Sequence, residues 1–137
     1  IIKNNCSRAM IKLHKQHNSS IIASKKVKWK NVSRWGIFKL KKFSKNNFLI
    51  KDVVEKPSIK SAPSNYAVIG RYILPVKIFK ILKKQKPGQN GEIHITDAIR
   101  TLIHQNNKFI GHVFAGKYLD CGTMQGYINS FTEVSKL

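Results

Sequence analysis

Acidic residues are scarce in this 137-residue chain, which has 6 Asp and Glu against 26 Lys and Arg and a formal charge of +20. Arginine is scarce too, because 22 of the basic residues are Lys and only 4 are Arg. Proteins that read nucleic-acid sequence depend on the planar arginine fork, so this balance argues against that class. The 18 Ile and 11 Asn, together with Lys, are the residues that AT-rich codons favour. We therefore attribute most of the charge to genome composition and keep binding to a nucleic acid or another polyanion as the alternative.

Long apolar runs and clustered cysteines are also lacking. No run approaches the ~20 residues that a membrane span needs, and the opening I-I-K-N-N-C-S-R-A-M lacks the basic-then-apolar order of a secretory signal. Cys6 and Cys121 lie far apart and match no metal-ligand spacing, so we expect reduced thiols in a cytoplasmic protein without a membrane partner. The 42% of hydrophobic residues fits one ordinary domain. Because the chain begins at Ile1 rather than a methionine, we expect a piece of something longer.

Helical and strand patterns alternate along the chain. Apolar residues at helical spacing predict an amphipathic helix over residues 2–17, and Pro75 can open another over 76–84. Gly70, inside the most strand-like run, indicates a bulge or a place where a ligand approaches the backbone. The other expected elements are a helix capped by Thr96 or Asp97, a last helix capped by Thr123, strands at 20–27, 66–74 and 108–115, and a hairpin with its turn at 44–47. This pattern predicts an α/β fold with a mixed sheet layered with helices.

Glu55 and Lys56 stand together at the end of an expected strand, in V-V-E-K-P. A carboxylate can accept hydrogen bonds from neighbouring sugar hydroxyls, and an adjacent ammonium can neutralise a phosphate. Because successive strand residues point to opposite faces, the pair can meet one ligand only if the backbone turns there, as Pro57 permits. From these residues alone, a surface ion pair is the favoured interpretation.

Two further stretches hold acidic residues. Glu92 and Asp97 lie in G-E-I-H-I-T-D-A-I, where helix capping accounts for Asp97 and gives it a structural role. Asp120 lies in Y-L-D-C-G-T, between an expected strand and an expected helix. That position suits a carboxylate that binds Mg²⁺ beside a phosphate, because hard cations prefer oxygen ligands. A helix cap or a turn aspartate explains Asp120 equally well. The sequence has no Walker loop, G-x-S-x-G or zinc motif.

Four motifs in order resemble bacterial UTP–glucose-1-phosphate uridylyltransferases: V-E-K-P, A-P-S-N-Y-A-V-I-G-R-Y, P-G-Q-N-G-E-I-H-I-T-D-A-I and D-C-G-T-x-x-G-Y. Upstream, V-S-R-W-G-I-F is similar to that family's Val-Ser-x-Tyr-Gly stretch. The resemblance runs from about Ile2 to the C-terminus, and D-C-G favours the glucose branch over the thymidylyltransferases. It implies a Rossmann-like nucleotidyltransferase fold. It also implies the reaction of UTP with glucose 1-phosphate to give UDP-glucose and pyrophosphate, with Mg²⁺ as cofactor.

The resemblance also implies roles for five residues of this sequence. The glycine matching Gly36 and the residue matching Val68 meet the sugar through their main chains. The glutamate matching Glu55 holds sugar hydroxyls. The lysine matching Lys56, the expected catalytic residue, reaches the sugar phosphate, and the aspartate matching Asp120 binds the metal.

Family members are much longer than this chain. Their first half, which carries a Gly-rich nucleotide loop, the uracil pocket and a second metal-binding aspartate, has no counterpart in residues 1–137. We therefore expect residues 1–137 to be the C-terminal sugar-phosphate-binding part of a nucleotidyltransferase domain, inactive alone. Its strand edges should be exposed and apolar helix faces uncovered. The resemblance further implies a homo-oligomer for the full-length protein.

Three alternatives stay open. A related sugar-1-phosphate nucleotidyltransferase could use another nucleotide, since the absent half chooses the base. A non-catalytic remnant could bind a sugar nucleotide or a full-length paralogue, although the intact Glu55, Lys56 and Asp120 count against decay. A basic nucleic-acid-binding module would show DNA affinity that falls steeply with salt.

Overall fold

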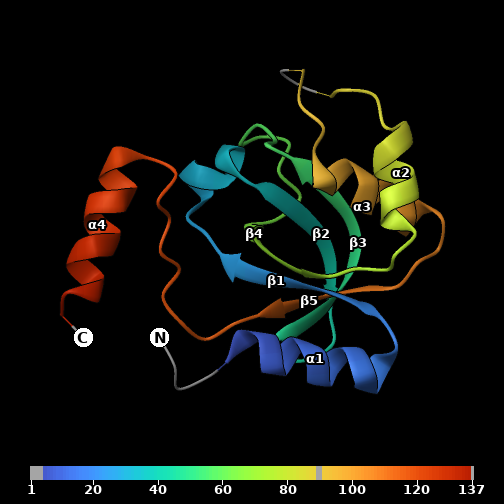
Figure 1. Ribbon diagram of the computed structural model, residues 1–137, viewed down its shortest axis with the longest axis horizontal. Coiled ribbons are helices and arrows are strands. Elements are labelled where there is room, and N and C mark those ends of the chain that lie inside the picture. The colour runs from blue at the N-terminus through green and yellow to red at the C-terminus, as the bar shows by residue number, and fades with distance from the viewer. Residues whose placement is uncertain (1–4, 89–90, 137) are drawn as a thin grey trace.

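The computed structural model describes residues 5–88 and 91–136, and it confirms the mixed α/β fold (Figure 1). Residues 2–4, the start of the first expected helix, lie outside the described residues. A 3-10 helix, η1, leads into the second strand. The elements in chain order are α1 (Cys6–His17), β1 (Ser20–Lys26), η1 (Trp29–Arg34), β2 (Gly36–Lys42), β3 (Asn47–Glu55), β4 (Tyr66–Ile73), α2 (Ile78–Lys84), α3 (Ile95–His104), β5 (Phe109–Val113) and α4 (Met124–Val134).

The five strands form one sheet that closes into a ring in the order β1, β4, β2, β3, β5. Strand β5 runs parallel to β1, and the other pairings are antiparallel. Our expectation of exposed strand edges was therefore wrong for the described strands, because the β2–β3 hairpin pairs with β5 and also reaches β4. The contact with β4 is narrow and pairs Ile37 with Ala67.

Gly70 lies in a bulge of β4, as a glycine inside a strand predicted. Ile22 of β1 lies opposite Tyr72, and Ser24 lies opposite Val68, so β4 has extra residues between these two pairs. Gly70 has a φ of +70°, a left-handed conformation that favours glycine. Val68 and Tyr72, on either side of the bulge, both pack against the same core as Ile22.

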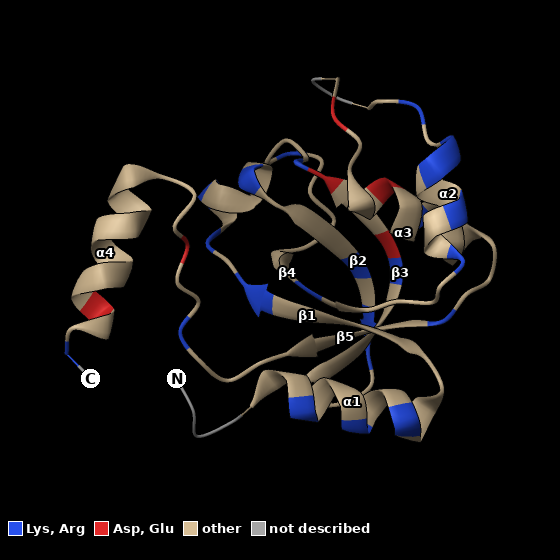
Figure 2. Cartoon of the chain, in the orientation of Figure 1, with Lys and Arg blue, Asp and Glu red and all other residues tan. Residues whose placement is uncertain are grey.

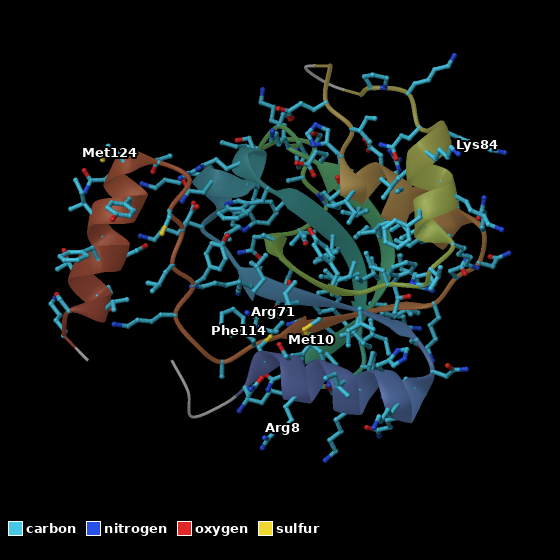
Figure 3. The ribbon with its side chains drawn as sticks, in the orientation of Figure 1. Arg8, Met10, Arg71, Lys84, Phe114 and Met124 are labelled. Carbon is cyan, nitrogen blue, oxygen red and sulfur yellow. The ribbon has the colours of Figure 1, made fainter. Side chains whose placement is uncertain are left out.

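Helices cover both faces of the sheet (Figure 1). The main core lies between the sheet and the helices α2 and α3, and Phe38, Phe48 and Phe109 are its largest fully buried side chains. On the opposite face, Met10 of α1 packs against Ile21 and its neighbours (Figure 3). This arrangement confirms the predicted layering of helices on a sheet.

The two predicted helix caps have different outcomes. Thr123 caps α4 as expected, because its Oγ1 accepts the N–H of Gly126 at 3.0 Å. Helix α3 begins earlier than expected, since its N-cap is His94, whose extended backbone precedes Ile95 without a side-chain capping bond. Thr96 and Asp97 therefore lie inside the first turn, and assigning either as the cap was wrong.

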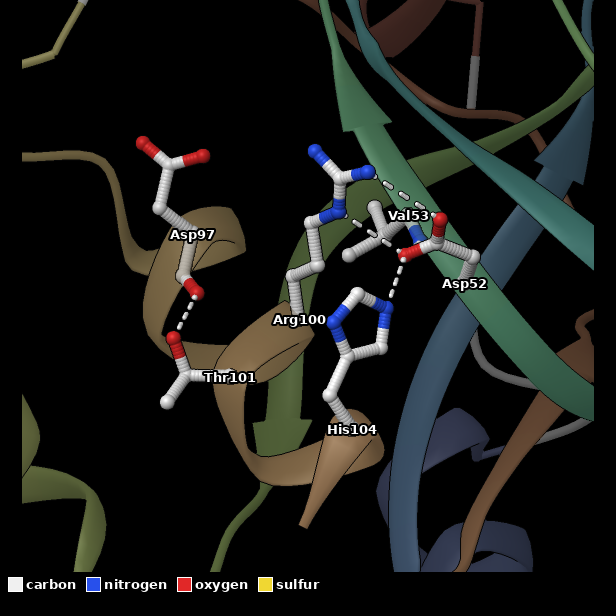
Figure 4. A network of polar contacts seen from close by, with 6 residues as sticks. All are labelled: Asp52, Val53, Asp97, Arg100, Thr101 and His104. Carbon is white, nitrogen blue, oxygen red and sulfur yellow. Dashed lines mark hydrogen bonds and ion pairs between the residues drawn. The ribbon is translucent and has the colours of Figure 1, made fainter. Parts of the chain in front are cut away.

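An ion cluster fastens α3 to β3 (Figure 4). Asp52 of β3 accepts hydrogen bonds from Arg100 Nε at 3.1 Å and Nη2 at 3.4 Å. The Nε2 atom of His104 lies 3.4 Å from the same carboxylate. The Asp52 side chain is 20% exposed, so solvent screens these contacts less than it would on an open surface. The cluster therefore helps to fix how α3 lies along β3.

The surface carries dispersed charge (Figure 2) and an uncovered apolar face on α4. Lys and Arg are spread over α1, α2 and several loops in Figure 2, as expected for solvated charge. Tyr127, Phe131 and Val134 of α4 are exposed, which confirms the expected uncovered apolar face. Within the described residues, no helix combines the length and apolar character that crossing a membrane requires.

The pairing of Gly111 with Phe48 gives a test of the core. A methyl group on Gly111 would overlap the Phe48 ring, which lies opposite it across β5 and β3. We expect Gly111→Ala to lower the free energy of unfolding by about 1–3 kcal/mol in urea denaturation, because a packed core yields little. The double variant with Phe48→Leu should lose less than the two single variants combined, since the smaller side chain leaves room for the methyl. An unchanged midpoint in Gly111→Ala would contradict this packing.

Candidate functional site

Three of the predicted site residues come together where β2 begins and β3 ends. Gly36 pairs with Glu55 across the hairpin, and Val68 of β4 lies beside them. A methyl group on Gly36 would lie 2.8 Å from Cγ2 of Thr96, 2.9 Å from Oε2 of Glu55 and 3.3 Å from Cγ2 of Val68. A glycine leaves these neighbours room, so the bare backbone of Gly36 lies directly beside Thr96, Glu55 and Val68.

A helix holds the Glu55 carboxylate, and no basic side chain of the described residues forms an ion pair with it. Thr96, in the first turn of α3, donates its hydroxyl to Oε2 of Glu55 at 2.7 Å. Thr96 itself is only 5% exposed. A carboxylate has about four acceptor positions, so Glu55 keeps acceptor capacity for the hydroxyl groups of a ligand.

The backbone turns at Lys56, which meets the condition for Glu55 and Lys56 to face one ligand. Lys56 has a φ of +43°, and its N–H donates to the carbonyl of Trp35 at 3.0 Å. Pro57, directly after it, is buried. Within residues 5–88 and 91–136 no carboxylate forms an ion pair with Lys56, so the surface ion pair considered from sequence is absent there.

Asp120 lies against the residues that lead into β2. Its Oδ2 is 3.4 Å from Nη2 of Arg34, and its Oδ1 accepts the N–H of Gly122 at 3.1 Å. The second bond is the local contact expected of a turn aspartate. The rings of Trp35 and Tyr118 meet edge to face at 5.4 Å between centroids. Because Arg34 and Trp35 directly precede Gly36, Asp120 is tied to the same corner of the molecule.

Two phenols connect the surroundings of Glu55 with those of Asp120. Burial raises the pKa of Tyr72 to about 12, and the charge of Glu55 and the neighbouring Tyr118 add to the effect. Burial also raises the pKa of Tyr118, with further contributions from Asp120 and Cys121. Both phenols therefore stay neutral at physiological pH and keep their hydroxyl protons for donation.

One carboxylate, that of Asp120, fits the expected metal in this part of the molecule. Oxygen is the right donor for Mg²⁺, and within the described residues each Asp120 oxygen has one contact, Oδ2 with Arg34 and Oδ1 with the N–H of Gly122, which leaves acceptor capacity on both. The described part of the chain contains no group of three or more His, Cys, Asp or Glu side chains that could hold a metal ion. These residues would thus supply one protein ligand rather than a complete cage.

A half-open groove adjoins Tyr118, and the sequence did not predict it. Its volume is about 620 Å³, and it lies between the start of α1, the β4 bulge and the segment 114–119. Arg71 and Phe114 line it (Figure 3), and Arg71 donates to Ser7 at 3.4 Å across one end.

Sequence reasoning missed Thr96, Tyr72 and the Arg34–Trp35 pair. Thr96 lies in the motif G-E-I-H-I-T-D-A-I, but a threonine before an expected helix is most simply interpreted as a cap. Tyr72 had no signal beyond its place in a strand. The contact of Arg34 with Asp120 spans 86 residues, so no local pattern could indicate it.

Comparison with known proteins identifies the family. The Nucleotidyl transferase family matches residues 1–136. The chain belongs to this family. This nucleotidyl transferase chain is 37% identical over 123 residues to UTP–glucose-1-phosphate uridylyltransferase of Pseudomonas aeruginosa, covering 90% of the chain and 44% of the relative. It is 35% identical over 125 residues to UTP–glucose-1-phosphate uridylyltransferase 2 of Streptococcus pyogenes serotype M3, covering 90% and 42%.

Solved structures give the same result. A UDP-glucose pyrophosphorylase complexed with UDP-glucose matches with a TM-score of 0.88 and 43% identity, over 94% of this chain and 48% of that one. A UTP-bound UGPase from Acinetobacter baumannii matches with a TM-score of 0.78 and 28% identity, over 96% and 46%. The resemblance expected from the motifs is confirmed. The nucleotidyl transferase chain spans about half the length of these relatives.

The raised pKa of Tyr72 gives a test of the site. Tyr72 ionises near pH 10 in the unfolded chain but only near pH 12 in the folded protein. The free energy of unfolding should therefore fall as pH rises from 10 through about 12, and it should fall less in Tyr72→Phe. In an absorbance titration of the folded protein at pH 11, wild type and Tyr72→Phe should show equal tyrosinate signals. Tyr127→Phe, which removes an exposed phenol, is the control. A deficit of one tyrosinate in Tyr72→Phe at pH 11 would contradict this environment.

Proposed function

We propose that this chain is the C-terminal, sugar-phosphate-binding part of a UTP–glucose-1-phosphate uridylyltransferase. The observation that carries the proposal is the convergence of Gly36, Glu55 and Val68, with Lys56 at the adjoining turn. The names of the relatives support the activity. Because the chain spans about half their length, the complete reaction belongs to a longer protein.

The proposed reaction brings two polyanions together. A phosphate oxygen of glucose 1-phosphate attacks the α-phosphorus of UTP, and the bond from that phosphorus to pyrophosphate breaks, giving UDP-glucose. Glu55 would accept hydrogen bonds from sugar hydroxyls, beside the main chains of Gly36 and Val68. The ammonium group of Lys56, the proposed catalytic residue, would offset the charge of the sugar phosphate and lower the electrostatic cost of the approach.

Asp120 is the proposed Mg²⁺ ligand. Its carboxylate suits a hard cation, and its side chain is 33% exposed, so an ion from solvent can reach it beside Arg34. When bound, Mg²⁺ would supply positive charge beside the phosphates. Asp120 would bind and orient this charge, and Trp35 and Tyr118 would hold its segment against the start of β2.

The leading alternative is a related sugar-1-phosphate nucleotidyltransferase. The D-C-G triplet and the names of relatives at 35–37% identity favour the uridylyltransferase. A non-catalytic remnant would keep the Glu55 geometry without turnover in any longer form of the protein. The dispersed lysines favour neither alternative.

We also infer a homo-oligomer in a reducing, cytoplasmic setting. The exposed Tyr127 and Phe131 of α4 support an interface between copies, and Cys6 and Cys121 are both unpaired. The chain should sediment as a dimer or larger, and Phe131→Lys should yield monomers with an unchanged circular dichroism spectrum. Sedimentation of the wild-type chain as a monomer would contradict the interface.

The site assignment is tested by binding to the isolated chain. We expect weak binding of glucose 1-phosphate. Amide chemical shifts would report this binding, and we expect them to change most around residues 36, 55–56 and 68. Glu55→Gln and Lys56→Met should each weaken binding about tenfold or more, since hydrogen bonds to charged groups contribute roughly 1.5–3 kcal/mol. Glu133→Gln on α4 and Lys12→Met on α1 are matched controls on other surfaces and should leave binding unchanged.

Two outcomes would contradict the proposal. Shift changes confined to other surfaces would exclude this placement of the sugar phosphate. Tight binding of UDP-glucose in a calorimetric titration, or its synthesis by the isolated chain, would contradict the division of the site between this chain and further residues.

A further inference from the structure

We propose that Thr96 is a positioning residue, which holds the Glu55 carboxylate in one orientation toward a bound sugar. This inference rests on the proposed function of the same site. Thr96 acts through Glu55, whereas Glu55 itself would touch the sugar. The sequence predicted Thr96 or Asp97 as the N-cap of this helix, and the structure excludes a capping role for Thr96 because the N-cap is His94.

The two oxygens of Glu55 have different surroundings. Oε2 faces inward, because it accepts the Thr96 hydroxyl at 2.7 Å and lies 2.9 Å from the position that a methyl group on Gly36 would take. Oε1 makes no side-chain hydrogen bond within the described residues, so it is the acceptor left for a sugar hydroxyl. Fixing the inner oxygen removes the rotation that would otherwise exchange the two.

The hydroxyl of Thr96 is committed to this contact. Threonine near a helix start commonly bonds to backbone N–H groups of the first turn, but α3 has no side-chain cap. Thr96 is buried, so its hydroxyl lacks the alternative of solvent. Its methyl group lies 2.8 Å from the position that a Cβ on Gly36 would take, so Thr96 packs beside the bare backbone of Gly36.

A second contact keeps Thr96 in place from one turn away. Arg100 follows Thr96 by four residues and so lies on the same face of α3. It binds Asp52, which precedes Glu55 by three residues on β3 (Figure 4). The helix is therefore attached to the strand at two points, Thr96 to Glu55 and Arg100 to Asp52. Movement of α3 along β3 would have to break both.

Substitution at Thr96 tests the inference without depending on turnover. In ligand-free protein, scalar couplings of the Glu55 side chain should report one rotamer in wild type and in Thr96→Ser, which keeps the hydroxyl. Thr96→Val keeps the shape and loses the hydroxyl, so the couplings should average. Thr101→Val is the matched control, because Thr101 is exposed on the same helix and its hydroxyl bonds to the carbonyl of Asp97.

Binding supplies the second measurement. Thr96→Val should weaken the binding of glucose 1-phosphate about tenfold, which is the effect of losing one well-oriented hydrogen bond to a charged group. The same variant should leave the binding of inorganic phosphate unchanged. Thr96→Ser should restore sugar binding. An ordered Glu55 in Thr96→Val, or equal loss of both ligands, would overturn the positioning role. Failure of wild type to bind glucose 1-phosphate, with Glu55 disordered only in Thr96→Val, would instead refute the proposed function and leave Thr96 as the residue that orders Glu55.

Discussion

The pairing of Gly36 with Glu55 at the open end of the β2–β3 hairpin is the constraint on which the site depends. It places a carboxylate directly beside a backbone that has no side chain, and α3 and β4 can then close in around both. A larger residue at position 36 would collide with Thr96 and Glu55 and crowd Val68. The left-handed turn at Lys56 follows from the same geometry, because the chain must leave the hairpin where the pairing ends. Sheet register thus determines which groups a ligand can meet.

Glu55 differs from most of the other acidic residues in the kind of side chain that contacts its carboxylate. In a chain of charge +20, an acid is expected to attract a basic side chain, and four of the six do. Those contacts are Asp52 with Arg100, Glu92 with His94, Asp120 with Arg34 and Glu133 with Lys117. Glu55 is instead held by the neutral hydroxyl of Thr96, near the neutral phenol of Tyr72. Within residues 5–88 and 91–136 its negative charge therefore forms no ion pair and stays available to the hydroxyl groups of a ligand.

Local patterns in the sequence predicted the elements well and their contacts poorly. The β2–β3 hairpin followed from polar turn residues between two apolar runs, and Gly70 marked the bulge in β4. The start of α3 was missed because Thr96 and Asp97 are both better capping residues than His94, and tertiary contacts decided otherwise. The closed ring also could not be predicted, since the contact between Ile37 and Ala67 depends on how the whole hairpin folds across the sheet.

The candidate site shows the same division. Motifs located Gly36, Glu55, Lys56, Val68 and Asp120, because resemblance to a family carries positions directly. The family resemblance could not reveal Thr96 or Tyr72, because their roles arise from contacts between elements that are separate in sequence. Residues that support a functional group are harder to predict than the group itself, because many side chains can perform the support.

A structure of the chain crystallised with glucose 1-phosphate would test the central claim most directly. The account predicts sugar hydroxyls within hydrogen-bond distance of Glu55, with the phosphate on the side of Lys56. Binding of the ligand in the groove lined by Arg71 and Lys117, with the Glu55 site empty, would contradict it.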